Sequence, residues 1–460
     1  MAGKEGAELQ YLNHYYEKEG SRLVVLYGQK NIGMSDMILD FCHDKPQAYY
    51  RARPCSEREQ LYLWGCEQKE EGASLPAYPS YAELFDSMTG DGRRGEKSVV
   101  VIEEFQNIVK QSVDFVPELI RFLHNGRSES QVMVILASTS IGWVENSMVR
   151  RIGAAAYEIS GFIKIKEQGF FNAARRFPEY TKEQQIEAYA VLGGFPGLWR
   201  HFEAHLTVKE NICRHILQKD GFLHEEALRL VSEQLRETGV YHAILEALAS
   251  GRHKLNDLHL HTGFSRAKIS VYLKNLMELE IVEKVFSYDT EGRENTQKGI
   301  YRIQNRFVAF YFRYLYPHMS RLALMAEDEF CERFYETYIA PDFGSFAAPA
   351  FAQACREYMD RMNCEERLPI VYTRAGEWIG KAGSIDLVAQ DEAGRTLIGL
   401  CSWEKPVMSY EDYERLLLCA RQAKLSPDYI YLFSALRFDE SLTREAEKNG
   451  SLRLIGLDAL

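Results

Sequence analysis

Long apolar runs, paired cysteines and an excess of positive charge are all missing from this chain of 460 residues. No apolar stretch approaches the roughly 20 residues that cross a bilayer, and the start MAGKEGAELQ has no apolar core of a secretion signal. We therefore expect a cytoplasmic protein with no membrane partner. The nine cysteines include no C-x-x-C pair, which argues against a zinc site or a disulfide framework.

The net charge of −11 excludes a polycation that coats nucleic acid, so any contact with DNA needs a local basic patch. Apolar residues make up 46% of the chain and charged residues 26%, which is typical of globular proteins. The length predicts several domains.

The stretch from Leu23 to Cys42 has the pattern of a strand, a glycine loop and a helix. The spacing of Gly28 and Gly33 matches G-x-x-x-x-G-K-[ST], the phosphate-binding P-loop motif, and Ser35 occupies the position of the magnesium-binding hydroxyl. Main-chain N–H groups of such a loop, together with the following helix N-terminus, attract phosphate. The predicted nucleotide-binding residues are Gly28, Gln29, Lys30, Asn31, Ile32, Gly33, Met34 and Ser35.

The motif lysine is absent, because position 34 is Met. Met34 supplies neither charge nor a hydrogen-bond donor, whereas Lys30, inside the loop, is a candidate substitute cation. The alternative is a vestigial turn without a ligand.

The apolar run from Ser98 to Ile102 predicts a buried strand that ends in Glu103 and Glu104. This is the Walker B layout, in which the first acid holds magnesium and its neighbour orients the attacking water. We assign Glu103, with Ser35, to the metal and Glu104 to the water. The alternative is a pair of solvated acids. Ser138 and Thr139, after the strand from Gln131 to Ala137, occupy the place of a γ-phosphate sensor.

Strands and helices alternate up to about residue 165, which predicts a doubly wound α/β sheet. Helical patterns follow to about residue 235, interrupted by a sharp Gly-Gly-Phe-Pro turn at residues 193–196.

Three amphipathic helices and two short strands then predict a winged helix-turn-helix. The third helix is capped by Ser265, and the strands flank a polar loop at residues 289–298. The predicted DNA contacts are Arg266, Lys268 and Lys274. The alternative is a winged helix that packs against protein, which the acids Glu278, Glu280, Glu283 and Glu291 favour.

Further strands and a helix beyond residue 380 predict a second, smaller α/β domain. Asp386 is a lone acid, interpreted as a turn or strand-end residue, because no acid-x-lysine pair follows it to hold magnesium.

Taken in order, these segments resemble a family of archaeal and bacterial AAA-like P-loop ATPases with a winged helix and a C-terminal restriction-endonuclease-like domain. The resemblance rests on VVLYGQKNIGMSDMI, VVVIEEFQNI, VILASTS, the GGFP turn, YHAILEALASG with VYLKNLMELEIVEKV, YRIQNRFVAFYFRYLYP, and GSIDLVA with GLCSW. It implies a P-loop NTPase core at 1–160, a helical lid at 161–236, a winged helix and connector at 237–318, and a restriction-endonuclease-like domain at 319–460.

The chain departs from this family at positions that carry chemistry. Besides Met34 and Glu103, alanines follow Gly153 where an arginine finger is frequent, Ala352 replaces a glutamate, and Leu400-Cys401-Ser402 replaces Glu-Cys-Lys. The resemblance therefore implies a degenerate ATPase, a pseudoenzyme that binds ATP or ADP and Mg²⁺ weakly or without hydrolysis, with an inactive nuclease-like domain.

Its role is then regulatory, DNA-associated or scaffolding, with a protein partner or self-association left open. Two alternatives stay open: a slow ATPase that uses Lys30, and a winged-helix DNA-binding regulator whose ATPase frame serves as an assembly body.

Overall fold

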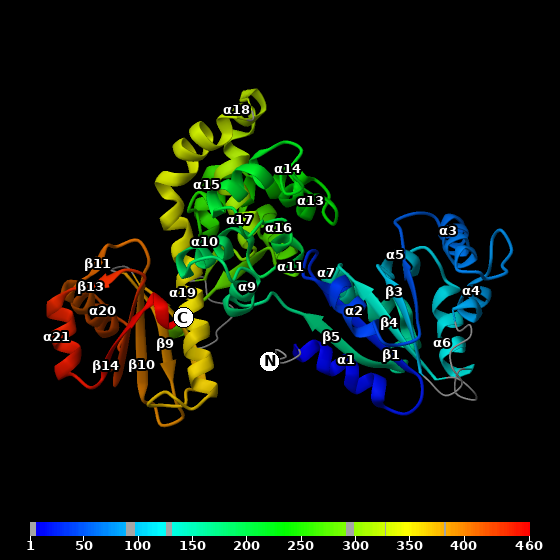
Figure 1. The fold of residues 1–460 in the computed structure, drawn as a ribbon, viewed down its shortest axis with the longest axis horizontal. Helices are drawn as coiled ribbons and strands as arrows, with labels where there is room; N and C mark the ends of the chain where they lie inside the picture. The colour runs from blue at the N-terminus through cyan, green and yellow to red at the C-terminus, as the bar shows by residue number, and fades with distance from the viewer. Residues whose placement is uncertain (1–5, 89–96, 126–130, 291–298, 327, 381–382) are drawn as a thin grey trace. The chain divides into compact units, whose positions relative to one another are not determined.

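The computed structural model describes residues 6–88, 97–125, 131–290, 299–326, 328–380 and 383–460 (Figure 1). The chain folds into two compact units, residues 1–166 and 167–460. Among the described helices, none has the length and apolar character that crossing a membrane requires.

Unit 1 is built on a parallel five-stranded sheet with the order β2-β3-β4-β1-β5. The strands are β1 (Arg22–Gly28), β2 (Gln47–Arg51), β3 (Ser98–Glu103), β4 (Val132–Ser138) and β5 (Ile159–Ile165). The predicted α/β sheet is thus confirmed. Its strand order brings the ends of β1, β3 and β4 together, where the P-loop and the two predicted acids lie.

The helices of unit 1 cover both faces of this sheet (Figure 1). On one face, alternate strand residues such as Val25 and Val100 pack with Trp64, Phe85 and Phe122 in a buried core. On the other, α1 packs against β1, β5 and α2. The helices are α1 (Ala7–Glu17), α2 (Met34–Cys42), α3 (Glu57–Glu70), α4 (Tyr81–Ser87), α5 (Gln106–Val109), α6 (Phe115–Asn125), α7 (Ile141–Trp143), η1 (Val144–Met148), α8 (Val149–Ile152) and η2 (Gly153–Glu158).

Unit 2 begins with a helical region whose anchor is the predicted glycine turn. The main-chain N–H of Gly194 donates to Glu167 Oε1 at 2.8 Å, and the N–H of Gln168 donates to the Gly194 carbonyl at 3.0 Å. A Cβ on Gly194 would lie 1.7 Å from the Gln168 carbonyl oxygen, so only glycine fits. The elements are α9 (Phe170–Arg176), α10 (Lys182–Leu192), α11 (Pro196–Trp199), α12 (Val208–Asn211), η3 (Ile212–Leu217) and α13 (Glu226–Ser232).

The winged helix-turn-helix forms as predicted. The Ser265 hydroxyl caps the third helix by accepting from the Lys268 N–H at 3.2 Å, and the two wing strands pair antiparallel. Most of the predicted polar wing loop, residues 291–298, lies outside the described residues. The elements are α14 (Thr238–Ala249), α15 (Leu255–Thr262), α16 (Arg266–Glu278), β6 (Val282–Val285), η4 (Tyr288–Thr290) and β7 (Ile300–Ile303).

A buried aromatic connector leads from the wing to the last α/β portion, whose sheet has the order β14-β12-β10-β9-β8. The strands β8, β9 and β10 pair antiparallel, whereas β10, β12 and β14 pair parallel. The connector contains α17 (Arg306–Phe310), η5 (Tyr311–Leu315), η6 (Tyr316–His318), α18 (Met319–Leu324) and η7 (Phe330–Ile339). The α/β portion contains α19 (Ala340–Cys364), β8 (Arg374–Ile379), β9 (Ser384–Gln390), β10 (Thr396–Ser402), β11 (Val407–Met408), α20 (Tyr410–Gln422), β12 (Tyr429–Ser434), β13 (Arg437–Phe438), α21 (Glu440–Lys448), β14 (Leu452–Gly456) and η8 (Leu457–Ala459).

One expectation about cysteine is wrong. Cys213 on η3 and Cys331 on η7 form a disulfide, with their Cα atoms 5.6 Å apart. The two residues are 118 positions apart in the chain, so only the packing of η3 against η7 reveals the pair. Local spacing carries no signal for it.

Candidate functional site

The predicted phosphate loop connects β1 to α2 and has the backbone of an anion-binding turn. Asn31 and Gly33 adopt left-handed conformations, with φ of 64° and 85°. Gly28 is required by close packing, because a Cβ there would lie 2.9 Å from the Ile165 carbonyl oxygen. Gly33 is the N-cap residue of α2 and makes no side-chain hydrogen bond to the helix. The first main-chain N–H groups of α2 therefore have no side-chain acceptor at this position. This arrangement fits a phosphate group.

Met34 replaces the motif lysine with a side chain that belongs to the protein interior. It is 3% exposed, as is Ile32 two residues earlier. Lys30 is partly exposed on the same loop, as are Gln29 and Asn31. The loop therefore keeps its glycine geometry, while the cation at position 34 is exchanged for an apolar contact.

Ser35 and Glu103 lie in direct contact, although they are 68 residues apart. The Ser35 hydroxyl donates to Glu103 Oε1 at 2.5 Å. The Tyr49 hydroxyl, from the neighbouring strand β2, donates to Glu103 Oε2. Burial, followed by the hydrogen bond to Glu103 and its negative charge, raises the pKa of Tyr49, so its proton stays on the phenol. Glu103 is 1% exposed, and both of its oxygens accept from a hydroxyl.

Tyr49 is the member of this group that sequence reasoning missed. Only the order of strands in the sheet indicates that Tyr49 reaches Glu103. β2 lies beside β3, and Arg51, two residues after Tyr49, pairs with Glu103 in the register. Magnesium would be held by Ser35 and Glu103, but the ion would have to replace hydroxyl donors on the carboxylate. The residues present thus fit phosphate better than they fit the metal.

Glu104 follows the strand in a left-handed conformation, with φ of 54°. Its Oε1 accepts from the Thr139 hydroxyl at 2.8 Å, and its Oε2 accepts from Gln106 Nε2 at 2.5 Å. Glu104 is 9% exposed. The interpretation of Glu103 and Glu104 as solvated acids is therefore wrong: both are buried and hydrogen-bonded. Thr139, at the expected sensor position, holds Glu104.

The basic residues predicted to touch DNA lie along α16 in unit 2. Arg266 donates to Asn256 Oδ1 at 2.5 Å, and the Lys268 ammonium lies 5.0 Å from the Phe264 ring centre. Lys274 lies 3.8 Å from the carboxylate of Glu278. The exposed face of α16 also carries small and apolar side chains: Ala267, Ser270 and Val271.

Among the acids near the wing, burial raises the pKa of Glu283 despite nearby Arg302. Glu283 is nevertheless an exposed residue of β6, so its carboxylate adds acidic character to the wing. The structure leaves the helix face with a mixed basic and apolar character.

Asp386 is neither a turn residue nor a strand-end residue, because it lies inside β9. Its Oδ2 accepts from the Cys401 main-chain N–H at 2.7 Å, and burial raises its pKa. Among the residues that the structure describes, no cluster of three or more histidine, cysteine or acidic side chains could hold a metal ion.

Comparisons with known proteins match separate parts of the chain. Residues 311–416 match a family described as archaea bacterial proteins of unknown function, and residues 243–284 match the bacterial regulatory protein, arsR family. An uncharacterized protein of Methanocaldococcus jannaschii is 24% identical over 386 residues, which cover 84% of this chain and 83% of the relative.

Two solved structures are similar in outline. The Walker-type ATPase of Pyrococcus abyssi has a TM-score of 0.45 and 16% identity, covering 66% of this chain and 94% of its own. The ORC2 protein of Aeropyrum pernix, in ADPNP and ADP complexes, has a TM-score of 0.43 and 12% identity, covering 70% and 93%. The fold of this chain itself combines a P-loop α/β sheet with a helical region and a winged helix-turn-helix.

Proposed function

We propose that this protein binds a nucleotide on the loop from Gly28 to Ser35 without hydrolysing it, and serves a regulatory role in contact with DNA. The observation that carries the proposal is the state of Glu103. This acid is buried, and both carboxylate oxygens accept from the hydroxyls of Ser35 and Tyr49.

Phosphate binding is supported by what the loop keeps. Its glycines allow the left-handed turn, and α2 begins without a side-chain cap. Partial positive charge at such a helix start stabilises an anion, and Lys30 lies in the loop as the cation that would assist it. Binding of this kind needs no lysine at position 34.

The absence of hydrolysis is supported by what the loop and the acids lack. Because position 34 is Met and not lysine, no cation at this position stabilises the charge that develops on the transferred phosphoryl group. Glu103 would need to release a hydroxyl before it held a metal. Glu104 is bound by Thr139 and Gln106, so it would need to turn before it oriented water.

The deciding experiment is a thermal-unfolding titration with ATP and ADP, with and without Mg²⁺. A site filled at about 100 times its dissociation constant adds about 2.7 kcal/mol of stability. We expect nucleotide to stabilise the protein by a similar amount with and without the metal, and phosphate release to stay at the blank level. No stabilisation at millimolar nucleotide would leave the scaffolding role instead.

The slow-ATPase alternative predicts a different outcome in the same preparation. Phosphate release would exceed the blank, would disappear in Lys30→Ala, and would be unchanged in the matched loop variant Met34→Ala. Both variants remove one long side chain from the same loop, so a general loss of loop structure would affect both.

DNA binding is supported by the exposed face of α16. Arginine and lysine can bind phosphates and base edges, while the exposed Val271 and Ala267 suit contact with a thymine methyl. We expect binding to a duplex to weaken steeply with salt, and Lys268→Ala and Lys274→Ala each to lower the logarithmic salt slope by about 1. Arg444→Ala is the control, because Arg444 lies on α21 and pairs with Glu440. Binding that ignores salt would remove DNA from the proposal.

A further inference from the structure

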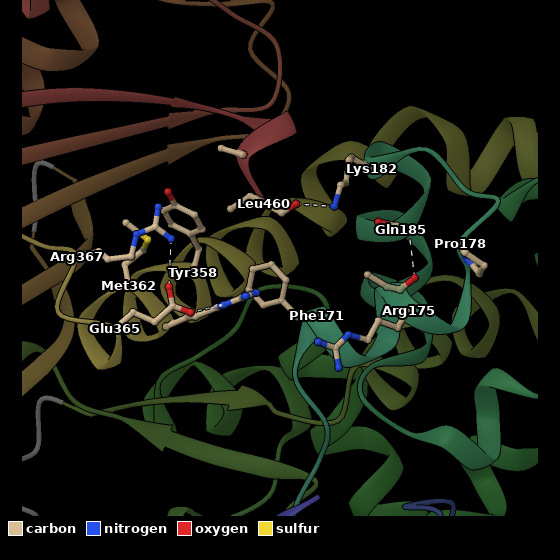
Figure 2. Close-up of a pocket in the computed structure, with 13 residues that line it drawn as sticks. Phe171, Arg175, Pro178, Lys182, Gln185, Tyr358, Met362, Glu365, Arg367 and Leu460 are labelled. Atoms are coloured by element: carbon tan, nitrogen blue, oxygen red, sulfur yellow. Dashed lines mark hydrogen bonds and ion pairs between the residues drawn. The ribbon is translucent and has the colours of Figure 1, made fainter. Parts of the chain in front are cut away.

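A cavity of about 550 Å³ lies inside unit 2, between the helices α9 and α10 on one side and α19 on the other (Figure 2). Its volume falls in the range of about 300–1,000 Å³ typical of small-molecule sites. The cavity is separate from the P-loop, which belongs to unit 1.

The cavity carries more positive than negative side chains. Four cations line it, Arg175, Lys182, Arg361 and Arg367, against one acid, Glu365. Glu365 is engaged by two of the cations, with Arg361 Nε at 3.1 Å and Arg367 Nη1 at 3.2 Å. These bonds lower the pKa of Glu365, so the acid is charged and neutralises only part of the cluster. An anionic group on a ligand would be stabilised here.

The other two cations have different neighbours. Lys182 Nζ donates to the main-chain oxygen of Leu460 at 2.5 Å, a contact drawn in Figure 2. Arg175 is exposed and makes no ion pair with any residue that the structure describes. Its guanidinium presents donors in the planar fork that fits phosphate oxygens.

One lining residue supplies a hydrogen-bond acceptor that the protein leaves unused. Gln185 is 8% exposed, and its Nε2 donates to the carbonyls of Phe177 at 2.9 Å and Ala174 at 3.3 Å. With the amide nitrogen fixed in this way, its Oε1 is buried without a partner among the described residues. A buried acceptor of this kind is costly unless a donor reaches it. A ligand with an N–H group would supply that donor.

Aromatic rings line the same cavity from two different elements. Phe171 comes from α9 and Tyr358 from α19 (Figure 2). The Arg361 guanidinium lies 5.9 Å from the centre of the Phe171 ring. Phenyl, phenol and guanidinium planes are the surfaces on which flat heteroaromatic rings stack.

We infer that this cavity binds a nucleoside monophosphate, with the phosphate on the arginines, the base beside Phe171 and Tyr358, and a base N–H donated to Gln185 Oε1. Inorganic phosphate would satisfy only the cations, and an uncharged apolar ligand only the rings. A nucleotide carries all three features. Because α9, α10 and α19 form the walls, the bound ligand stabilises the packing of the helical region against α19.

The test is calorimetric titration of the full chain with AMP, GMP, CMP and UMP, with inorganic phosphate as the reference ligand. The Lys30→Ala/Ser35→Ala background weakens binding at the P-loop, and the arginine variants described below report on the cavity alone, so failure of this inference is distinguishable from failure of the function proposed above. We expect at least one nucleotide to bind at millimolar concentration or tighter. Phosphate should bind more weakly than that nucleotide.

Two of the lining arginines are exposed, so each can be replaced to weaken nucleotide binding without disturbing the fold. Arg175→Ala and Arg367→Ala should each weaken the nucleotide by about tenfold, as expected for the loss of one charged hydrogen bond. Arg444→Ala, an exposed arginine elsewhere in unit 2, should leave binding unchanged. Phe171→Leu should weaken the nucleotide but not phosphate.

Four results would overturn the inference. No nucleotide binds at millimolar concentration, or the arginine variants bind as well as the Lys30→Ala/Ser35→Ala background, or phosphate competes as strongly as the nucleotide. Displacement of the nucleotide by a short DNA duplex at lower concentration would instead assign the cations to the nucleic-acid backbone, and would also contradict the inference.

Discussion

The two α/β sheets of this protein treat an acid on a central strand in opposite ways. Glu103, at the end of β3, accepts from the side-chain hydroxyls of Ser35 and Tyr49. Asp386, inside β9, accepts from the main-chain N–H of Cys401. A hydroxyl can rotate to another acceptor, whereas a main-chain N–H is fixed by its strand. The first acid can therefore be released to a ligand, and the second is committed to the fold.

The largest effect that tests this difference is expected from restoring the missing cation. Met34→Lys places an ammonium at the start of α2, beside the proposed phosphate site. We expect ATP to bind about 100-fold more tightly, close to the roughly 2.7 kcal/mol that a charged hydrogen bond to phosphate contributes. Calorimetric titration of the variant against the native chain measures it.

The matched control for this change is Met37→Lys, which adds the same charge one turn further along α2. It should raise the affinity much less, because the effect of charge near a helix start falls off within a turn. Equal affinity of Met34→Lys and the native chain would mean that the loop is a turn without a ligand, and the contrast between the two sheets would then lose its functional meaning.

The second effect concerns stability. Glu103→Ala removes the acceptor of two hydroxyls in a buried setting, so we expect the free energy of unfolding to fall by about 2 kcal/mol. Urea titration followed by circular dichroism measures the loss in unit 1. Arg51→Ala is the control: Arg51 lies 3.9 Å from Glu103 but is largely exposed, and such a pair contributes little. An unchanged midpoint for Glu103→Ala would show that neither hydroxyl depends on this acid.

The third effect is smaller and changes with pH. Burial raises the pKa of Asp386 above its ordinary value of 3.8. Well below pH 3.8 the side chain is protonated in both the folded and the unfolded chain, so it does not favour either state. As pH rises, the unfolded chain ionises first, and stability falls until the folded pKa is passed. Asp386→Asn should therefore leave stability unchanged at low pH and raise it near pH 7.

Asp412→Asn provides the opposite sign in the same portion of the chain. Burial opposes its ionisation, but hydrogen bonds from Lys405 and Ser409 outweigh burial and lower its pKa. Its contribution is present above its unfolded pKa and is lost as pH falls through the folded value, so the variant should be less stable at pH 7. If both variants shifted stability in the same direction, the interpretation of Asp386 as a buried, penalised charge would be wrong.

Sequence patterns predict much of this fold because its central strands are unusually apolar. Val99 to Ile102 and Met133 to Ala137 are continuous buried runs, and both strands were located from them. β5 was missed because Ser160, Gly161 and Lys164 interrupt its apolar residues. The same interruption by charge at Arg453 hides β14.

The candidate site likewise contains one contact that the sequence predicts and one residue that it does not. The contact of Ser35 with Glu103 follows from parallel strands whose carboxyl ends meet at one edge of the sheet, with β4 between β1 and β3. Tyr49 was not predictable, because no local pattern says that β2 lies beside β3. The Cys213–Cys331 pair and the Gln185 cavity depend likewise on helix packing across long stretches of chain.

The smallest effect separates the two hydroxyls on Glu103. Tyr49→Phe removes one donor and leaves Ser35 in place, so an oxygen of Glu103 becomes available to a cation. We expect Mg²⁺ to strengthen ATP binding about threefold in this variant, the equivalent of a single weak hydrogen bond, while the native chain shows no such dependence. Tyr50→Phe is the matched control, because the neighbouring phenol accepts from Gln60 and does not touch Glu103. The same magnesium response in both variants would mean that loss of a tyrosine on β2 loosens the sheet without freeing Glu103. The conclusion that Glu103 can be released to a ligand would then be wrong.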